Sequence, residues 1–269
     1  MSPRSTTGPI ALLPMYDWPE CRVATDALWQ ALASALMGAG FDAPGHLTRS
    51  DRPLNDLWTA PELLLGQTCG LPYVRDLAGR VQLVATPAYT LPDCAPGHYC
   101  SRIIVRHDAK TGDIQDLRGK TAAINGWNSQ SGFVALAAMT PGWNPAHYFG
   151  KLELSGGHLA SLQAVATGQA DVAAIDAVSF ALAERHLPDL TGRVRVLTSS
   201  PETPGLPLIT AKGFSADQVE LIQAVVQDVL SAPGTRAARA ELLINGAVAV
   251  TDRTYDPIRD MAAETGRAA

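Results

Sequence analysis

The feature that most constrains this fold is a regular alternation of short apolar segments with helical segments. Strands are expected at residues 10–15, 63–66, 81–86, 102–106, 121–125, 151–154, 172–176, 193–198 and 208–211. Helical periodicity is expected over residues 20–37, 132–139, 159–167, 177–186, 219–230, 237–244 and 258–264. Strands that alternate with helices in this way are typical of an α/β fold with mostly parallel sheets.

The chain length predicts two lobes. At roughly 150 residues per domain, the 269 residues correspond to about two domains. No linker separates two halves of the sequence, so we expect the chain to cross between the lobes on strands, at residues 102–106 and 193–198. Lobe 1 would then comprise residues 1–103 and 198–269, and lobe 2 residues 104–197.

Charge and hydropathy argue against two classes of partner. The formal net charge is −5 and there is no Lys/Arg run, so nucleic-acid binding is not expected. No apolar stretch approaches the roughly 18 residues of a membrane helix, so no membrane insertion is expected. The N-terminus carries no apolar leader segment, which predicts a cytoplasmic protein as written, or a periplasmic one if a leader was removed.

The clearest candidate site is the segment Asn125-Gly-Trp-Asn-Ser129-Gln130-Ser131-Gly132, which follows a buried strand and opens an apolar helix. Backbone N–H groups at a helix start lack intrahelical acceptors and carry the positive end of the helix dipole. Together with the hydroxyls of Ser129 and Ser131, they can hold an oxyanion without Lys or Arg. A simple capping role for Ser129 is the alternative.

Two further polar residues are expected at the same edge of the sheet. His158 starts a helix after one strand, and Asp176 ends another. Ligands of open α/β sheets bind beyond the carboxyl ends of strands, so these residues and Ser129 form one candidate constellation. Aromatic side chains beside strand ends can also line a cleft, with packing at the edge of the core as the alternative for each. These are Tyr16, Trp18, Tyr89, Tyr99 and Trp127.

Catalytic, metal and cofactor motifs are missing from the sequence. There is no G-x-S-x-G, H-E-x-x-H, C-x-x-C or dinucleotide fingerprint, so neither a metal nor a cofactor is expected. Thiol catalysis by Cys69, or by Cys100 near His98, is an enzyme alternative. Cys69 and Cys94 each follow a strand, and if those strands are neighbours, the two sulfurs lie close enough to bond on oxidation.

Taken in order, short segments between residues 12 and 230 resemble the phosphate-, phosphite- and phosphonate-type substrate-binding proteins of ABC transporters, which have the type 2 periplasmic-binding fold. The segments are Leu13-Pro-Met-Tyr16-Asp, Gln67-Thr-Cys-Gly70, Pro87-Ala-Tyr89, Gly97-His-Tyr99-Cys-Ser101, Ser129-Gln-Ser-Gly132, Gly156-Gly-His158, Val172-Ala-Ala-Ile-Asp176 and Ser200-Pro-Glu-Thr-Pro-Gly205.

The resemblance implies a solute-binding protein whose two α/β lobes, joined by two hinge strands, close over a small oxyanion. The oxyanion would be held by residues 129–132 and His158, with Tyr99 and Tyr16 approaching from the other lobe. The resemblance also implies an ABC permease as a partner.

The sequence departs from the aminophosphonate binders of this family. Their acidic residues for the ligand's amino group correspond to Val178 and Leu206, and Asp176 lies two positions early. An aminoalkylphosphonate is therefore disfavoured. The same fold also hosts cytoplasmic enzymes similar to thiamine-pyrimidine synthases or menaquinone-pathway enzymes, as well as ligand sensors, and fold analogy alone does not choose among them.

Overall fold

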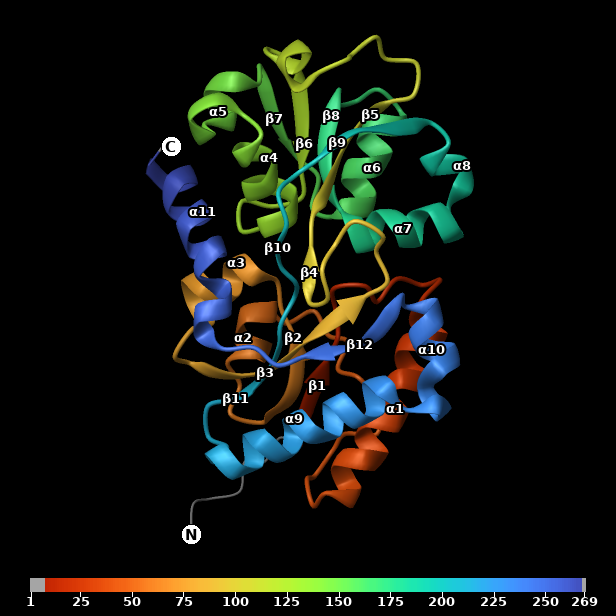
Figure 1. The fold of residues 1–269 in the computed structure, drawn as a ribbon, viewed down its shortest axis with the longest axis vertical. Coiled ribbons are helices and arrows are strands. Elements are labelled where there is room, and N and C mark those ends of the chain that lie inside the picture. The colour runs from red at the N-terminus through yellow and green to blue at the C-terminus, as the bar shows by residue number, and fades with distance from the viewer. Residues whose placement is uncertain (1–7, 268–269) are drawn as a thin grey trace. The chain divides into compact units, whose positions relative to one another are not determined.

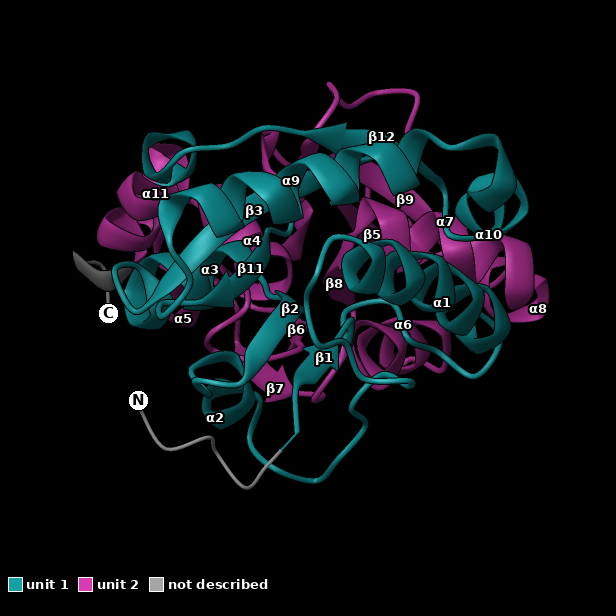
Figure 2. Cartoon of the chain, turned by 90° about the horizontal axis from the view of Figure 1, so that it is seen from below, with its two compact units in different colours: residues 1–90, 205–255 teal, residues 91–204, 256–269 magenta. Residues whose placement is uncertain are grey.

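A computed structural model describes residues 8–267, which divide into two compact units. Unit 1 comprises Met1–Thr90 and Gly205–Tyr255, and unit 2 comprises Leu91–Pro204 and Asp256–Ala269 (Figure 2). Residues 1–7 and 268–269 of the expected first lobe lie outside the described residues. The chain therefore passes between the units after Thr90, after Pro204 and after Tyr255.

Unit 1 is built on a five-stranded mixed sheet in the order β1-β2-β11-β3-β12 (Figure 1). Its strands are β1 (Ile10–Leu12), β2 (Leu63–Gln67), β3 (Val81–Tyr89), β11 (Leu208–Ala211) and β12 (Ile244–Val248). Its helices are α1 (Arg22–Gly38), α2 (Leu54–Trp58), α3 (Gly70–Pro72), η1 (Tyr73–Leu77), α9 (Ala216–Ser231), η5 (Pro233–Thr235), α10 (Arg236–Glu241) and η6 (Asp252–Tyr255). Only β1 and β2 pair in parallel, so the expected parallel pattern does not extend across this sheet.

The long helices of unit 1 follow the sequence pattern. Helix α1 buries Leu28, Leu32 and Leu36, which recur every four residues on one face. Helix α9 begins with the expected capping box: the Gln218 N–H donates to Ser215 Oγ at 3.3 Å, and the Ser215 N–H donates to Gln218 Oε1 at 2.9 Å. Among the helices of residues 8–267, none has the length and apolar character needed to cross a bilayer.

Unit 2 contains a second five-stranded sheet in the order β7-β6-β8-β5-β9, and the two-stranded ribbon β10-β4. Its strands are β4 (His98–Tyr99), β5 (Ser101–Arg106), β6 (Thr121–Ile124), β7 (Lys151–Leu154), β8 (Val172–Asp176), β9 (Val194–Ser199) and β10 (Thr203–Pro204). Its helices are η2 (Ile114–Leu117), η3 (Gln130–Val134), α4 (Ala135–Ala138), η4 (Pro141–Trp143), α5 (Pro145–Tyr148), α6 (His158–Ala166), α7 (Ala177–His186), α8 (Pro188–Thr191) and α11 (Asp256–Arg267).

The sheet of unit 2 is covered on both faces. Every residue of β8 is buried, which explains its uninterrupted apolar sequence. On one face, Val172 and Ala174 of β8 pack with Leu136 of α4 and Phe149 in one core cluster. Helix α6 also packs on β8 and β5, and Figure 1 shows α4 and α6 on opposite sides of this sheet.

The strands that carry the candidate site are parallel neighbours. Strand β6 pairs with β7 from Thr121 opposite Lys151 onwards, and it pairs with β8 through Ala122 opposite Val172. Because parallel strands end at the same edge, the segments that follow β6, β7 and β8 all leave the sheet there. The sequence places Ser129, His158 and Asp176 in or directly before those segments.

Three expectations about the chain path are corrected by the structure. Strands β5 and β9 do not cross between units, because β5 is hydrogen-bonded along its length to β8 and β9 within unit 2. The helix expected over 237–244 ends at Glu241, and β12 follows it along the edge of β3. Helix α11, expected in the first lobe, groups with unit 2 and packs on η3 and α4.

The proposed pairing of Cys69 with Cys94 rested on neighbouring strands, and this premise is wrong. Strand β11 lies between β2 and β3. None of the cysteines, all of which lie among the described residues, forms a disulfide, and the sulfur beside Cys94 is that of Cys100.

Gly150 provides a test of how the β6–β7 register is held. Its N–H donates to the Lys120 carbonyl at 2.9 Å, and a Cβ at this position would lie 2.3 Å from the Gly119 carbonyl oxygen. Because the obstacle is backbone, we expect Gly150→Ala to lower the free energy of unfolding by about 3 kcal/mol, the upper end of ordinary overpacking costs.

Urea denaturation followed by circular dichroism measures this change. Gly112→Ala is the matched control in the same unit, because its Cβ would meet only an ordinary contact of 3.7 Å. Equal stability of the two variants would show that the Gly119 backbone moves aside for the new Cβ, so that the contact between Gly150 and Gly119 does not fix the register.

Candidate functional site

The turn after β6 is organised by Ser129. Its backbone is extended and its Oγ accepts the Gly132 N–H at 2.9 Å, so it is the N-cap of the continuous helix formed by η3 and α4. Ser129, Gln130 and Ser131 are buried. The first amides of a helix have no preceding carbonyl to bond, so those of Gln130 and Ser131 lie at a buried helix start, where an acceptor is favoured.

Gly132 is required by the close approach of Asn125. A Cβ on Gly132 would lie 1.6 Å from Asn125 Oδ1, so no larger residue fits while the asparagine keeps its position. Asn125 Oδ1 and Gln130 Oε1 are both buried and have no hydrogen-bond partner among the described residues. Buried polar atoms are nearly always paired in folded proteins, so two unsatisfied atoms beside one turn mark a place where a ligand or water is expected.

The turn is joined to the start of α6 by a hydrogen bond between Ser131 Oγ and His158 Nε2, at 2.9 Å. Burial lowers the pKa of His158 from 6.5 to about 4, because the charged imidazolium loses its hydration there. The imidazole is therefore neutral at pH 7.

Asp176 lies at the end of β8 with its side chain buried. Its Oδ1 accepts the Ser179 N–H at 2.9 Å and caps helix α7. Its backbone stands opposite Ser101 of β5. A carboxylate close to an oxyanion would oppose its binding, and the observed contact is that of an N-cap. A contact between Asp176 and a ligand stays a prediction.

The two tyrosines of the candidate site lie in different units. Tyr99 is buried on β4, opposite Thr203 of β10, and belongs to the same unit as the Ser129 turn. This differs from the expected approach of Tyr99 from the other lobe. Tyr16 belongs to unit 1.

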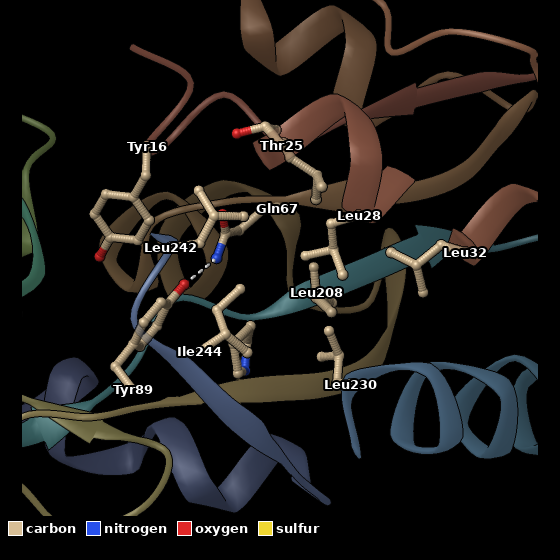
Figure 3. A pocket seen from close by; sticks show the side chains of 12 residues that line it. Tyr16, Thr25, Leu28, Leu32, Gln67, Tyr89, Leu208, Leu230, Leu242 and Ile244 are labelled. Carbon is tan, nitrogen blue, oxygen red and sulfur yellow. Dashed lines mark hydrogen bonds between the residues drawn. The ribbon is translucent and has the colours of Figure 1, made fainter. Parts of the chain in front are cut away.

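Tyr16 borders an apolar pocket of unit 1 (Figure 3). Its ring meets the Tyr89 ring edge-on at 5.5 Å, and Gln67 Nε2 donates to the Tyr89 hydroxyl at 3.1 Å. Leucine side chains also line this pocket. They include Leu28 of α1, Leu208 of β11 and Leu230 of α9. Sequence analysis did not predict a contact between Gln67 and Tyr89, because the two residues lie on different strands, β2 and β3.

The structure does not bring Cys100 and His98 together as a catalytic pair. Cys100 lies beside Cys94, and His98 Nδ1 contacts the carbonyl of Pro96. Within residues 8–267, no group of three or more His, Cys, Asp or Glu side chains is arranged to hold a metal ion. The groups gathered at the Ser129 turn are amides, hydroxyls and one neutral imidazole, which suit hydrogen bonding to an anion.

The contact between Gly132 and Asn125 gives a test of the turn. We expect Gly132→Ala to lower the free energy of unfolding by about 1–3 kcal/mol, because the new methyl group displaces the asparagine side chain. Asn125→Ala removes the obstacle, so the double variant should recover more than additivity predicts, with a coupling of about 1 kcal/mol or more. Chemical denaturation of the four proteins measures the coupling, and strict additivity would contradict the contact.

Solved structures of similar fold come from several bacteria. The binding-protein component of a phosphonate ABC transporter from Pseudomonas aeruginosa is 18% identical with a TM-score of 0.78, covering 97% of this chain and 88% of that one. PhnD1 from Prochlorococcus marinus, solved with methylphosphonate, is 12% identical with a TM-score of 0.78, covering 97% and 98%. A Xanthomonas citri protein bound to a chloride ion is 14% identical with a TM-score of 0.73, covering 98% and 99%.

These structures establish a two-lobed periplasmic-binding fold for the chain. A sequence search of curated proteins finds no significant match. A family model described as the periplasmic substrate-binding protein of phosphonate ABC transporters matches residues 10–255. With nearly the whole chain matched, the protein belongs to the family of periplasmic phosphonate-binding proteins of ABC transporters.

Proposed function

We propose that the turn of residues 129–132 and His158 hold the oxyanion head of a phosphonate, phosphite or phosphate. The observation that carries the proposal is the buried helix start at which Ser129 is the N-cap and Ser131 Oγ meets His158 Nε2 at 2.9 Å. A buried anion without a cation needs several aimed donors, and a helix start supplies them without reorganisation on binding. Tyr99 and Tyr16 are proposed as further ligand contacts.

The ligand's substituent is proposed to be small and uncharged. At the positions where aminophosphonate binders of the resembling family carry acidic residues, this chain has Val178 and Leu206, and both are buried apolar side chains. Neither can neutralise an ammonium group, so a ligand that carries one would lose its hydration without compensation. Methylphosphonate, phosphite and phosphate fit this requirement.

The protein would deliver such a ligand to an ABC permease, with its two lobes closing on the bound anion. The family to which the chain belongs supports this role, and delivery in that family takes place in the periplasm. Saturable binding without turnover is the expected behaviour, as for a substrate-binding protein of this family.

His158 is proposed to take up a proton when the anion binds. A neighbouring negative charge favours the protonated imidazole and opposes the burial that keeps it neutral in the free protein. Once protonated, Nε2 can only donate, so it donates to Ser131 Oγ and leaves the serine hydrogen for the ligand. On protonation, the pair of neutral groups therefore becomes a chain of two hydrogen bonds, in which His158 donates to Ser131 and Ser131 donates to the ligand.

The donor role of the turn can be tested by isothermal calorimetry. We expect methylphosphonate, phosphite or phosphate to bind the wild type, and Ser131→Ala and His158→Ala each to weaken the best of the three about tenfold or more, since a hydrogen bond to a charged group contributes about 1.5–3 kcal/mol. Ser199→Ala is the matched control, because Ser199 lies on β9 outside the turn and its Oγ accepts a hydrogen bond from Arg102 of β5. Equal affinities for all four proteins would mean that the turn is only a helix cap.

Proton uptake predicts a specific pH dependence. The pKa of His158 in the free protein is lowered to about 4, and the bound anion raises it. The proton therefore strengthens the complex as the pH falls from 7 through the pKa of the bound state, and the gain continues down to the pKa of the free protein, about 4. We expect the affinity ratio of wild type to His158→Gln to rise between pH 7 and pH 5, by at most about tenfold per pH unit.

The ratio cancels the titration of the ligand itself, which affects both proteins equally. A ratio that stays constant over this range would rule out proton uptake by His158 and leave the donor role of Ser131 standing.

A further inference from the structure

Two thiols of unit 2 lie next to each other without being bonded. The Sγ atoms of Cys94 and Cys100 are 3.7 Å apart. A disulfide bond is about 2.0 Å long, so closing the gap requires a movement of less than 2 Å by the two side chains together. Cys100 is buried and Cys94 is half-buried, and neither has a role in the proposed anion site.

The backbone holds the two cysteines in place independently of their own contact. Before Cys94, Asp93 forms an ion pair with Arg102 at 3.0 Å, and after it the Ala95 N–H donates to Glu202 Oε2 at 3.0 Å. The loop is therefore anchored on both sides of Cys94.

Cys100 is held by the sheet. It lies between β4 and β5, and its carbonyl accepts the Ala177 N–H at 3.0 Å. Anchored backbones on both sides mean that little chain entropy is lost when the two sulfurs join, and that the cysteine pair is preorganised for a cross-link.

We propose that Cys94 and Cys100 form an intramolecular disulfide by exchange with a small-molecule disulfide such as oxidised glutathione. The Cys94 thiolate attacks one sulfur of glutathione disulfide and releases one glutathione thiolate. The Cys100 thiolate then attacks Cys94 Sγ and releases the second. Two S–H bonds of the protein give one S–S bond, two electrons pass to the glutathione disulfide, and the two protons end on the two glutathione thiols.

The order of attack follows from exposure. Cys94 keeps solvent-accessible surface, whereas Cys100 is only 4% exposed, so a solution disulfide reaches Cys94 first. Burial and the neighbouring Cys100 raise the pKa of the Cys94 thiol to about 12, with Glu202 acting in the same direction. The first exchange is therefore slow at neutral pH, and the pair behaves as a structural cross-link, unlike a fast redox catalyst.

The cross-link would fix the segment that carries Tyr99. Residues 94–100 form the connection that follows the passage of the chain out of unit 1 after Thr90. Oxidation would close this segment into a short loop, so the reduced and oxidised proteins should differ in the conformational freedom available to β4. This inference is independent of the proposed ligand.

Mass spectrometry after incubation with oxidised glutathione at mildly alkaline pH tests the proposal. We expect the wild type to lose two hydrogen atoms, and the tryptic peptide of residues 81–102, which holds both cysteines and neither Cys21 nor Cys69, to resist alkylation. Cys100→Ser should instead accumulate one glutathione on Cys94. Cys94→Ser should gain none on Cys100.

The variant Cys21→Ser/Cys69→Ser is the control and should oxidise like the wild type. Alkylation of both thiols in the 81–102 peptide after prolonged incubation would overturn the proposal, as would loss of two hydrogens in folded Cys100→Ser. The peptide measurement uses the wild-type protein alone, so it decides the matter even if a serine variant fails to fold.

Discussion

The parallel pairing of β6 with β7 and β8 is the constraint on which the rest of unit 2 depends. Residues from three separate stretches of chain become neighbours only because these strands end at one edge of the sheet. The pairing begins at a place where two backbones touch, with Gly150 against Gly119, and glycine is the residue that permits such an approach. A steric requirement at one end of the strands thus determines which side chains meet at the other.

The site formed at that edge relies on uncharged donors. Neither Lys nor Arg occurs in residues 125–132 or at the start of α6. In a buried setting, amides and hydroxyls avoid the desolvation cost that an unpaired cation would impose while the site is empty. The buried His158 is likewise neutral in the free protein, and under the proposed function its charge would appear only when a ligand brings the opposite one.

How far the sequence predicts this structure depends on the range of the interactions involved. The buried strands β8 and β11 were located to the residue, because their apolar runs and flanking turns are local signals. Strand β12 was missed, since its half-exposed residues carry no such run. Two contacts depend on turn geometry or on strand order, which periodicity does not report: Asn125 against Gly132, and Cys94 beside Cys100.

The position of α11 has a consequence for how unit 2 can be handled. Apart from this helix, the described part of unit 2 is one uninterrupted stretch, Leu91–Pro204, inserted into the sequence of unit 1. Helix α11 returns to it from the far end of the chain, and Gln130 Nε2 approaches Met261 Sδ at 3.6 Å. Excising 91–204 as a self-standing module, or fusing a reporter in place of the last helix, would uncover the surface of η3 and α4 on which α11 packs.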